Sequence, residues 1–188
     1  MFIALTGGIG CGKSAALKFL GECGFTTADA DKLCHAYYDN AEGIAQIAER
    51  WPSVIDANGK VDRKKLGNIV FRDENDLAWL ESVIAPFLQA QLADLQQKNT
   101  PTVVEVPLLF EKNMAARFDK TVAVWSPFAL RRSRLMMRNW DHAECSRRER
   151  LQWTPEKKLA MADYGLINTG SLELLQMQCR QLAEKLLK

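Results

Sequence analysis

Residues 7–14 read Gly-Gly-Ile-Gly-Cys-Gly-Lys-Ser, a glycine-rich segment that ends in a lysine and a hydroxyl residue. Its spacing fits the pattern G-x-x-x-x-G-K-[ST], in which glycines let backbone N–H groups close around phosphate oxygens. The apolar run before it, residues 2–6, is typical of a buried strand, and residues 15–20 favour a helix that ends by Gly24. A strand, a glycine loop and a helix in this order predict a phosphate-binding loop (P-loop).

The residue types of this loop predict how a bound nucleotide is held. Lys13 would reach the β and γ phosphates, and the Ser14 hydroxyl would ligate Mg²⁺. The following helix would direct the positive end of its dipole at the same phosphates. The predicted nucleotide-binding residues of the loop are Gly8, Ile9, Gly10, Cys11, Gly12, Lys13, Ser14 and Ala15.

The composition excludes several other classes of protein. The chain has 188 residues, 47% of them hydrophobic and 26% charged, which suits one globular domain with room for an inserted lobe. A net charge of +2 does not favour bulk nucleic-acid binding, and no apolar run approaches the ~20 residues of a membrane span. The five cysteines show no disulfide or metal spacing, which favours a reducing compartment.

The start of the chain bears on where the protein works. The first predicted strand begins at residue 2, so we expect no signal or transit peptide. We therefore expect a cytoplasmic protein without a membrane or nucleic-acid partner. A monomer and a small homo-oligomer both stay open.

Short apolar strands alternate with helices along much of the chain. This alternation predicts an α/β fold with a mostly parallel, five-stranded sheet flanked by helices. After the first strand, the others are expected at residues 25–28, 102–106, 121–125 and 164–167. Helices are expected at residues 32–38 and 42–50, after a cap at Asp62, on both sides of Pro86, at 108–111, and after caps at Ser126, Thr154 and Ser171.

Residues 40–99 carry no strand signal. About sixty helical residues between two sheet strands are too many for an ordinary crossover. We therefore predict a core formed by residues 1–39 and 100–188, with an inserted helical lobe at 40–99. This lobe would either serve packing or hold a second substrate.

Carboxylates stand at the expected carboxyl ends of two strands. Asp29 and Asp31 follow the second strand, where open parallel sheets form their ligand crevice. One of them is expected to be structural, for instance a helix cap, and the other to accept the proton of an attacking hydroxyl. Glu105, near the end of the third strand, fits a structural role and a metal-linked role equally well.

Residues 131–150 hold seven arginines and no lysine. Arginine binds phosphate oxygens bidentately, so an arginine-rich helical hairpin at about residues 131–153 predicts a lid over a polyphosphate. Asn139-Trp140-Asp141 interrupts the helical pattern, and Arg138 beside this turn is the expected functional arginine. Solvated positions are expected for Arg131, Arg132, Arg147 and Arg150.

One cysteine lies inside the P-loop. A thiol at a helix N-terminus can have a lowered pKa, so Cys11 could make the protein sensitive to oxidants. The alternative is that Cys11 is a small side chain that fits the loop. His35 and His142 form no metal-binding pattern.

A set of motifs in order along the chain resembles the dephospho-CoA kinase family. They are Leu5-Thr6-Gly7-Gly8-Ile9-Gly10, Asp29-Ala30-Asp31 with His35, Gly59 to Arg63 with Leu66 and Phe71, Val106-Pro107-Leu108-Leu109-Phe110-Glu111, the lid residues Arg134, Arg138, Arg148 and Gln152, then Ala162-Asp163 and Asn168-Thr169-Gly170. The chain departs from the usual pattern at Cys11, at Ala85 before Pro86, and at Glu105.

The resemblance implies a P-loop kinase of the nucleoside-monophosphate-kinase type. Such a kinase transfers the γ-phosphate of ATP, with Mg²⁺, to the ribose 3′-hydroxyl of dephospho-CoA, which is the last step of CoA synthesis. By this resemblance Asp31 is the base, Lys13 and Arg138 act on ATP, and Asn168 lies near adenine. The acceptor side would include Asp31, His35, Arg63, Pro107, Leu108 and Leu109.

Two other functions are compatible with a P-loop in this sequence. Another P-loop kinase, for a nucleoside monophosphate or a small alcohol, would share the core and differ in the insert. A regulatory nucleotide-binding switch would need a guanine-reading N-K-x-D segment, and Asn168-Thr169-Gly170 departs from it at the second position.

Overall fold

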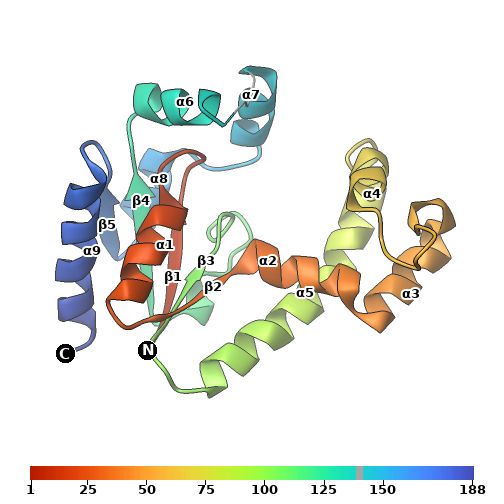
Figure 1. Cartoon of the computed structure of the whole chain (residues 1–188), viewed down its shortest axis with the longest axis horizontal. Helices are drawn as coiled ribbons and strands as arrows, with labels where there is room; N and C mark the ends of the chain where they lie inside the picture. The colour runs from red at the N-terminus through yellow and green to blue at the C-terminus, as the bar shows by residue number, and fades with distance from the viewer. Residues whose placement is uncertain (139–141) are drawn as a thin grey trace. The chain divides into compact units, whose positions relative to one another are not determined.

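The computed structural model describes residues 1–138 and 142–188 (Figure 1). The turn expected at Asn139-Trp140-Asp141 lies outside the described residues. The chain divides into two compact units, one formed by Met1–Asp29 with Asn99–Lys188 and the other by Ala30–Lys98. The helical unit thus starts at Ala30 rather than at residue 40, because α2 packs against α5.

The first unit contains a five-stranded parallel sheet with strand order β2-β3-β1-β4-β5. This arrangement confirms the predicted fold class, and all five strands lie close to their expected positions. The elements of this unit are β1 (Phe2–Gly7), α1 (Lys13–Glu22), β2 (Thr26–Asp29), β3 (Thr102–Glu105), η3 (Ala115–Arg117), β4 (Lys120–Trp125), α6 (Phe128–Met136), α7 (His142–Arg150), α8 (Pro155–Met161), β5 (Tyr164–Ile167) and α9 (Leu172–Leu186).

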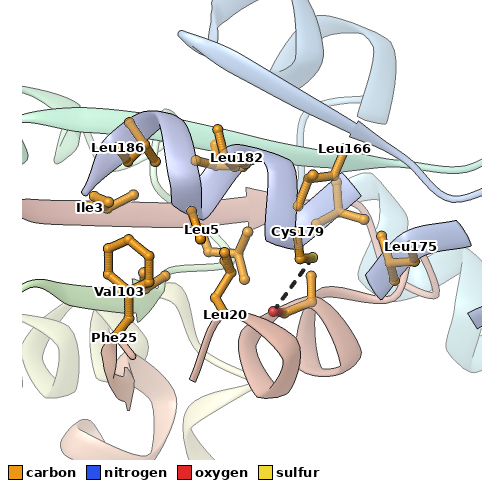
Figure 2. Packing of buried hydrophobic residues seen from close by; sticks show 14 of the residues in the cluster. Ile3, Leu5, Leu20, Phe25, Val103, Leu166, Leu175, Cys179, Leu182 and Leu186 are labelled. Atoms are coloured by element: carbon orange, nitrogen blue, oxygen red, sulfur yellow. Dashed lines mark hydrogen bonds between the residues drawn. The ribbon is translucent and has the colours of Figure 1, made fainter. Parts of the chain in front are cut away.

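The core of this unit lies between the sheet and the pair of helices α1 and α9 (Figure 2). Strand residues Ile3 and Leu5 face it, because alternate side chains of a strand point to the same side. The predicted apolar stripe of α9 is confirmed, since its four members, Leu175, Cys179, Leu182 and Leu186, are all buried. Burial of each large apolar side chain contributes roughly 1.5–3 kcal/mol.

The second unit is helical and has its own core. Its elements are α2 (Ala30–Ala36), η1 (Tyr37–Asp39), α3 (Ala41–Arg50), η2 (Pro52–Val54), α4 (Arg63–Val70) and α5 (Glu74–Gln97). The core of this unit is formed by the buried side chains of Tyr37, Ile47, Trp51, Val54, Leu66, Val70 and Leu80. At its margin the Arg50 guanidinium lies over the rings of Trp51 and Trp79, at 5.2 and 4.9 Å, and pairs with Asp76.

Three of the expected helix caps are confirmed by hydrogen bonds. The Asp62 carboxylate accepts from the backbone N–H groups of Lys64 and Lys65 at the start of α4. The hydroxyls of Thr154 and Ser171 do the same at the starts of α8 and α9. Each such cap stabilises the fold by about 1 kcal/mol.

The prediction that Ser126 caps a helix was wrong. α6 begins at Phe128 with Pro127 in the cap position and no side-chain cap. The hydroxyl of Ser126 is buried and donates instead to the backbone carbonyl of Asn168 over 2.8 Å. Ser126 therefore joins the ends of β4 and β5 rather than starting a helix.

Two expected helices also differ from the structure. α5 continues through Pro86 as one helix of 24 residues. The carbonyl that Pro86 leaves without an N–H donor belongs to Ser82, which is exposed, so water can solvate it. The helix expected at 108–111 is a turn over residues 107–113, although Lys112 N still donates to Leu108 O. In the described part of the chain, no helix is long and apolar enough to cross a membrane.

Candidate active site

The P-loop joins β1 to α1 with three glycines at positive φ. Gly12 has φ 101° as the N-cap of α1, and Gly10 has φ 76°. A Cβ atom on Gly12 would lie 2.3 Å from Asn168 Nδ2, and one on Gly10 would lie 2.9 Å from the carbonyl oxygen of Arg131. Both positions therefore require glycine for their backbone angles and for the close approach of a neighbour.

The residues expected to contact phosphate and metal lie at the start of α1. Lys13 is half-buried, and its Nζ donates to the carbonyl of Gly8 over 3.2 Å, so its ammonium group lies on the loop itself. Ser14 is exposed in the first turn of the helix. The cation and the hydroxyl are thus both on the P-loop, as the spacing predicts.

Asn168 supports the P-loop from the segment after β5. Its side chain is buried, donates to Cys11 O over 2.8 Å and accepts from Arg134 over 3.2 Å. Both ends of its amide are therefore bonded to protein, and its expected place near adenine stays a prediction. Sequence reasoning did not anticipate the supporting role.

Two lid arginines reach the loop from α6. Arg134 donates to the carbonyl of Gly10 over 3.4 Å and to the hydroxyl of Ser126 over 3.1 Å. Arg131 donates to the carbonyl of Ile9 over 3.2 Å, and the same Nη1 pairs with Glu149 of α7. Figure 1 shows α6 beside the loop between β1 and α1.

The expectation for Arg131 was therefore wrong. We expected it on a solvated face, whereas it is only 7% exposed and bonded to the P-loop. A charge count along the sequence cannot show this, because Arg131 and Arg132 are neighbours of the same type. Arg138, the expected functional arginine, is exposed just after α6.

The thiol inside the loop is not activated. Cys11 is fully buried, and this burial raises its pKa even though the charges of Arg131 and Lys13 act to lower it. A protonated, buried thiol is a poor nucleophile. The lowered pKa that we hypothesised for Cys11 is therefore wrong, and the small-side-chain alternative is supported.

Carboxylates meet at the carboxyl ends of β2 and β3. Asp29 and Glu105 are register partners on these neighbouring strands, and Glu105 is also the partner of Leu5 in β1. Glu105 is buried at 7% exposure. The sheet thus places Glu105 on the strand next to the one that carries the P-loop, and Asp29 beside it on the following strand.

The turn after β3 is anchored by a buried lysine. Lys158 of α8 is fully buried and donates to the carbonyl of Pro107 and, over 2.9 Å, to the carboxylate of Glu111. Among the expected acceptor residues of this turn, Pro107 and Leu108 are half-buried, whereas Leu109 is fully buried and could offer a ligand only its backbone. Sequence reasoning missed Lys158.

The helical unit carries the remaining expected residues. Asp31, His35 and Arg63 are all exposed. His35 lies near Tyr38, with ring centroids 6.1 Å apart, and the charge of Arg63 acts to lower the pKa of Tyr38, which burial raises. His35 of α2 and Arg63 of α4 therefore both lie near Tyr38.

The chemistry of this site fits Mg²⁺ bound together with phosphates. Among the described residues, no group of three or more acidic, histidine or cysteine side chains could hold a metal by itself. Mg²⁺ commonly keeps its waters and binds one or two protein oxygens together with substrate phosphates. An exposed Ser14 hydroxyl beside the loop suits that mode of binding.

Comparison with known proteins decides the family. The profile of the dephospho-CoA kinase family matches residues 1–173. The chain belongs to the dephospho-CoA kinase family. A dephospho-CoA kinase from Helicobacter pylori is 36% identical over 98% of this chain and 97% of the relative. The crystal structure of a Thermus thermophilus protein aligns with a TM-score of 0.86 at 33% identity, covering 99% and 97% of the two chains.

A solved family member agrees with this assignment. The dephospho-CoA kinase from Campylobacter jejuni aligns with a TM-score of 0.74 at 28% identity, covering 98% of this chain and 96% of that one. The family match at residues 1–173 includes the P-loop, the helical unit and the lid. The chain is therefore a P-loop kinase that uses ATP.

Proposed function

We propose that this chain transfers the γ-phosphoryl group of ATP to the ribose 3′-hydroxyl of dephospho-CoA and so completes CoA synthesis. The observation that carries the proposal is the P-loop with Lys13 lying on it, in a chain whose family match runs from residue 1 to residue 173. Phosphoryl transfer needs little covalent chemistry from the protein, because catalysis rests on positioning and charge neutralisation.

Each predicted residue has a role in this reaction. Asp31 would accept the proton of the acceptor 3′-hydroxyl. The oxygen of that hydroxyl then bonds to the γ-phosphorus, and the bond between this phosphorus and the leaving ADP breaks. Lys13 and the exposed Arg138 would neutralise charge on the transferred group. Ser14 would help to hold Mg²⁺, which would neutralise negative charge on the phosphates.

The resemblance assigns acceptor contacts to residues of the helical unit and, separately, to residues of the turn after β3. Exposed His35 and Arg63, near Tyr38, offer a cation and ring faces to a nucleotide. The half-buried Pro107 and Leu108 offer apolar and backbone contacts. These assignments rest on the resemblance, on exposure and on chemistry.

One assay tests the proposal. ADP release would be measured with ATP and Mg²⁺ alone, and then with dephospho-CoA, AMP, UMP or shikimate added. We expect dephospho-CoA to stimulate release far more than the other acceptors. Equal stimulation by AMP or shikimate, or none by dephospho-CoA, would assign the chain to another P-loop kinase activity.

A further inference from the structure

Lys158 is a fully buried cation that the reaction described above does not use. Lysine is almost never fully buried unless it is paired, because removing its charge from water is costly. Here burial lowers the pKa of Lys158, while Glu111 opposes that shift and the charge of Lys13 adds to it. The protein therefore retains a lysine at a position where an apolar side chain would avoid this cost.

The contacts of Lys158 join three segments around the P-loop. Its partner Pro107 O also accepts a hydrogen bond from the hydroxyl of Thr6, over 3.3 Å, and Thr6 directly precedes the loop. Its other partner, Glu111, accepts from the backbone N–H of Trp153, over 2.7 Å, where the lid returns to the core. The ammonium group thus binds two acceptors of the turn after β3, and the same two acceptors receive hydrogen bonds from the end of β1 and from the base of the lid.

The position of this turn in the sheet gives the contacts a consequence. β3 lies between β1, which carries the P-loop, and β2, which ends at Asp29. Ligands of open parallel sheets bind beyond the carboxyl ends of the strands. The turn that Lys158 contacts follows β3, so it would lie between the P-loop phosphates and the end of β2.

We propose that Lys158, through its pair with Glu111, is a positioning residue that sets the acceptor-side turn relative to the P-loop. This inference rests on the proposed function. Lys158 cannot touch either substrate, because its side chain is fully buried. The P-loop has separate supports in Asn168 and Arg134, so loss of Lys158 should affect the acceptor more than ATP.

The test separates binding of the two substrates. Lys158→Met, Lys158→Arg and the control Lys157→Met would be compared for kcat, for KM of dephospho-CoA and of ATP, and for ATP affinity by calorimetry. Lys157 is the neighbouring lysine on the same helix, but it is exposed and lies over the Trp153 ring. We expect Lys158→Met to lower kcat/KM for dephospho-CoA by up to about 100-fold, since a displacement near 1 Å can cost that much.

The other expected results follow from the same contacts. ATP affinity should stay unchanged in Lys158→Met, Lys158→Arg should recover part of the loss, and Lys157→Met should behave as wild type. Equal losses for ATP and dephospho-CoA would show a merely structural role and overturn the proposal. So would an unchanged kcat/KM for dephospho-CoA.

A second variant covers a failure of Lys158→Met to fold, which circular dichroism would reveal. Glu111→Gln keeps the lysine and weakens its hold on the turn, so it should give the same selective loss for dephospho-CoA. If it does not, the proposal is overturned. A wild-type protein that does not use dephospho-CoA would contradict the proposed function, whereas an active wild type with unaffected variants would contradict only this inference.

Discussion

The side-chain amide of Asn168 donates a 2.8 Å hydrogen bond to the backbone carbonyl of Cys11, across 157 positions of sequence. The contact places the segment after β5 against the P-loop, and only glycine fits at position 12 beside it. The shape of the loop therefore depends on residues that do not belong to it. Asn168, Arg134 and Arg131 all bond to its carbonyls, which leaves backbone N–H groups for phosphate.

Removing the Asn168 amide should weaken ATP use. Asn168→Ala leaves a buried carbonyl without its donor, which costs about 1–3 kcal/mol. We expect a lower melting temperature and a higher KM for ATP. The matched control is Gln178→Ala, which also removes a hydrogen-bonded amide, one that contacts the backbone of Ile167 and Leu174 on the exposed edge of β5. Equal KM values for ATP in the two variants would contradict the role given to Asn168.

The two adjacent lid arginines should behave differently. Arg131→Met removes a buried cation bonded to Ile9 O and Glu149, and it leaves both partners short of a donor. We expect a clear loss of stability and of kcat/KM for ATP. Arg132→Met, at a more exposed position, should change both quantities less. Thermal unfolding and steady-state kinetics would measure the difference, and a reversed order would refute this account of the lid.

The base should be found at the start of α2. Asp31→Asn removes the proposed proton acceptor and should lower kcat by about 10²- to 10⁴-fold, while KM for ATP stays similar. Asp39→Asn, an exposed carboxylate of the same unit, is the control and should keep its activity. A near-normal kcat in Asp31→Asn would move the role to Asp29.

The buried thiols should resist alkylation. All five cysteines lie in the described residues and none is in a disulfide. Burial raises the pKa of Cys179 to about 12, and it also raises the pKa of Cys11. Iodoacetamide should therefore label both thiols far more slowly in the folded than in the unfolded protein. Mass spectrometry of the labelled peptides would report each rate, and fast labelling of native Cys11 would revive its proposed sensitivity to oxidants.

The same shift sets a pH dependence of stability. The pKa of Cys179 is higher in the folded than in the unfolded protein, so the folded state binds this proton more tightly. The contribution of this bound proton to the free energy of unfolding is fully present below about pH 9. It is lost as the pH rises towards about 12. Cys179→Ala should remove this part of the alkaline decline in the free energy of unfolding.

Local signals predicted most of the fold. The strands, the P-loop, three helix caps and the α9 stripe all follow from the spacing of residues near to one another in sequence. Pro86 and Ser126 were misread for one reason, which is that tertiary contacts and exposure override local preference. Pro86 is tolerated on an exposed part of α5, and Ser126 finds a partner at Asn168.

The supports of the candidate site were harder to foresee. Their partners are far apart in sequence, as with Asn168 and Cys11 or Lys158 and Pro107. Nothing in Lys157-Lys158 says which lysine is buried, because both are the same residue type in the same helix. The residues that would bind phosphate could be predicted from a motif. The residues that support them depend on contacts of α6 with the P-loop and of α8 with the turn after β3, which the motif does not contain.

The most direct test of the whole account is the product made from dephospho-CoA and ATP with Mg²⁺. Mass spectrometry would follow the acceptor, and a 3′-nucleotidase would then locate the added group. We expect one added phosphoryl group per ADP formed, and we expect the 3′-nucleotidase to remove it. ADP formation without phosphorylated acceptor, or a phosphoryl group that resists this enzyme, would contradict it.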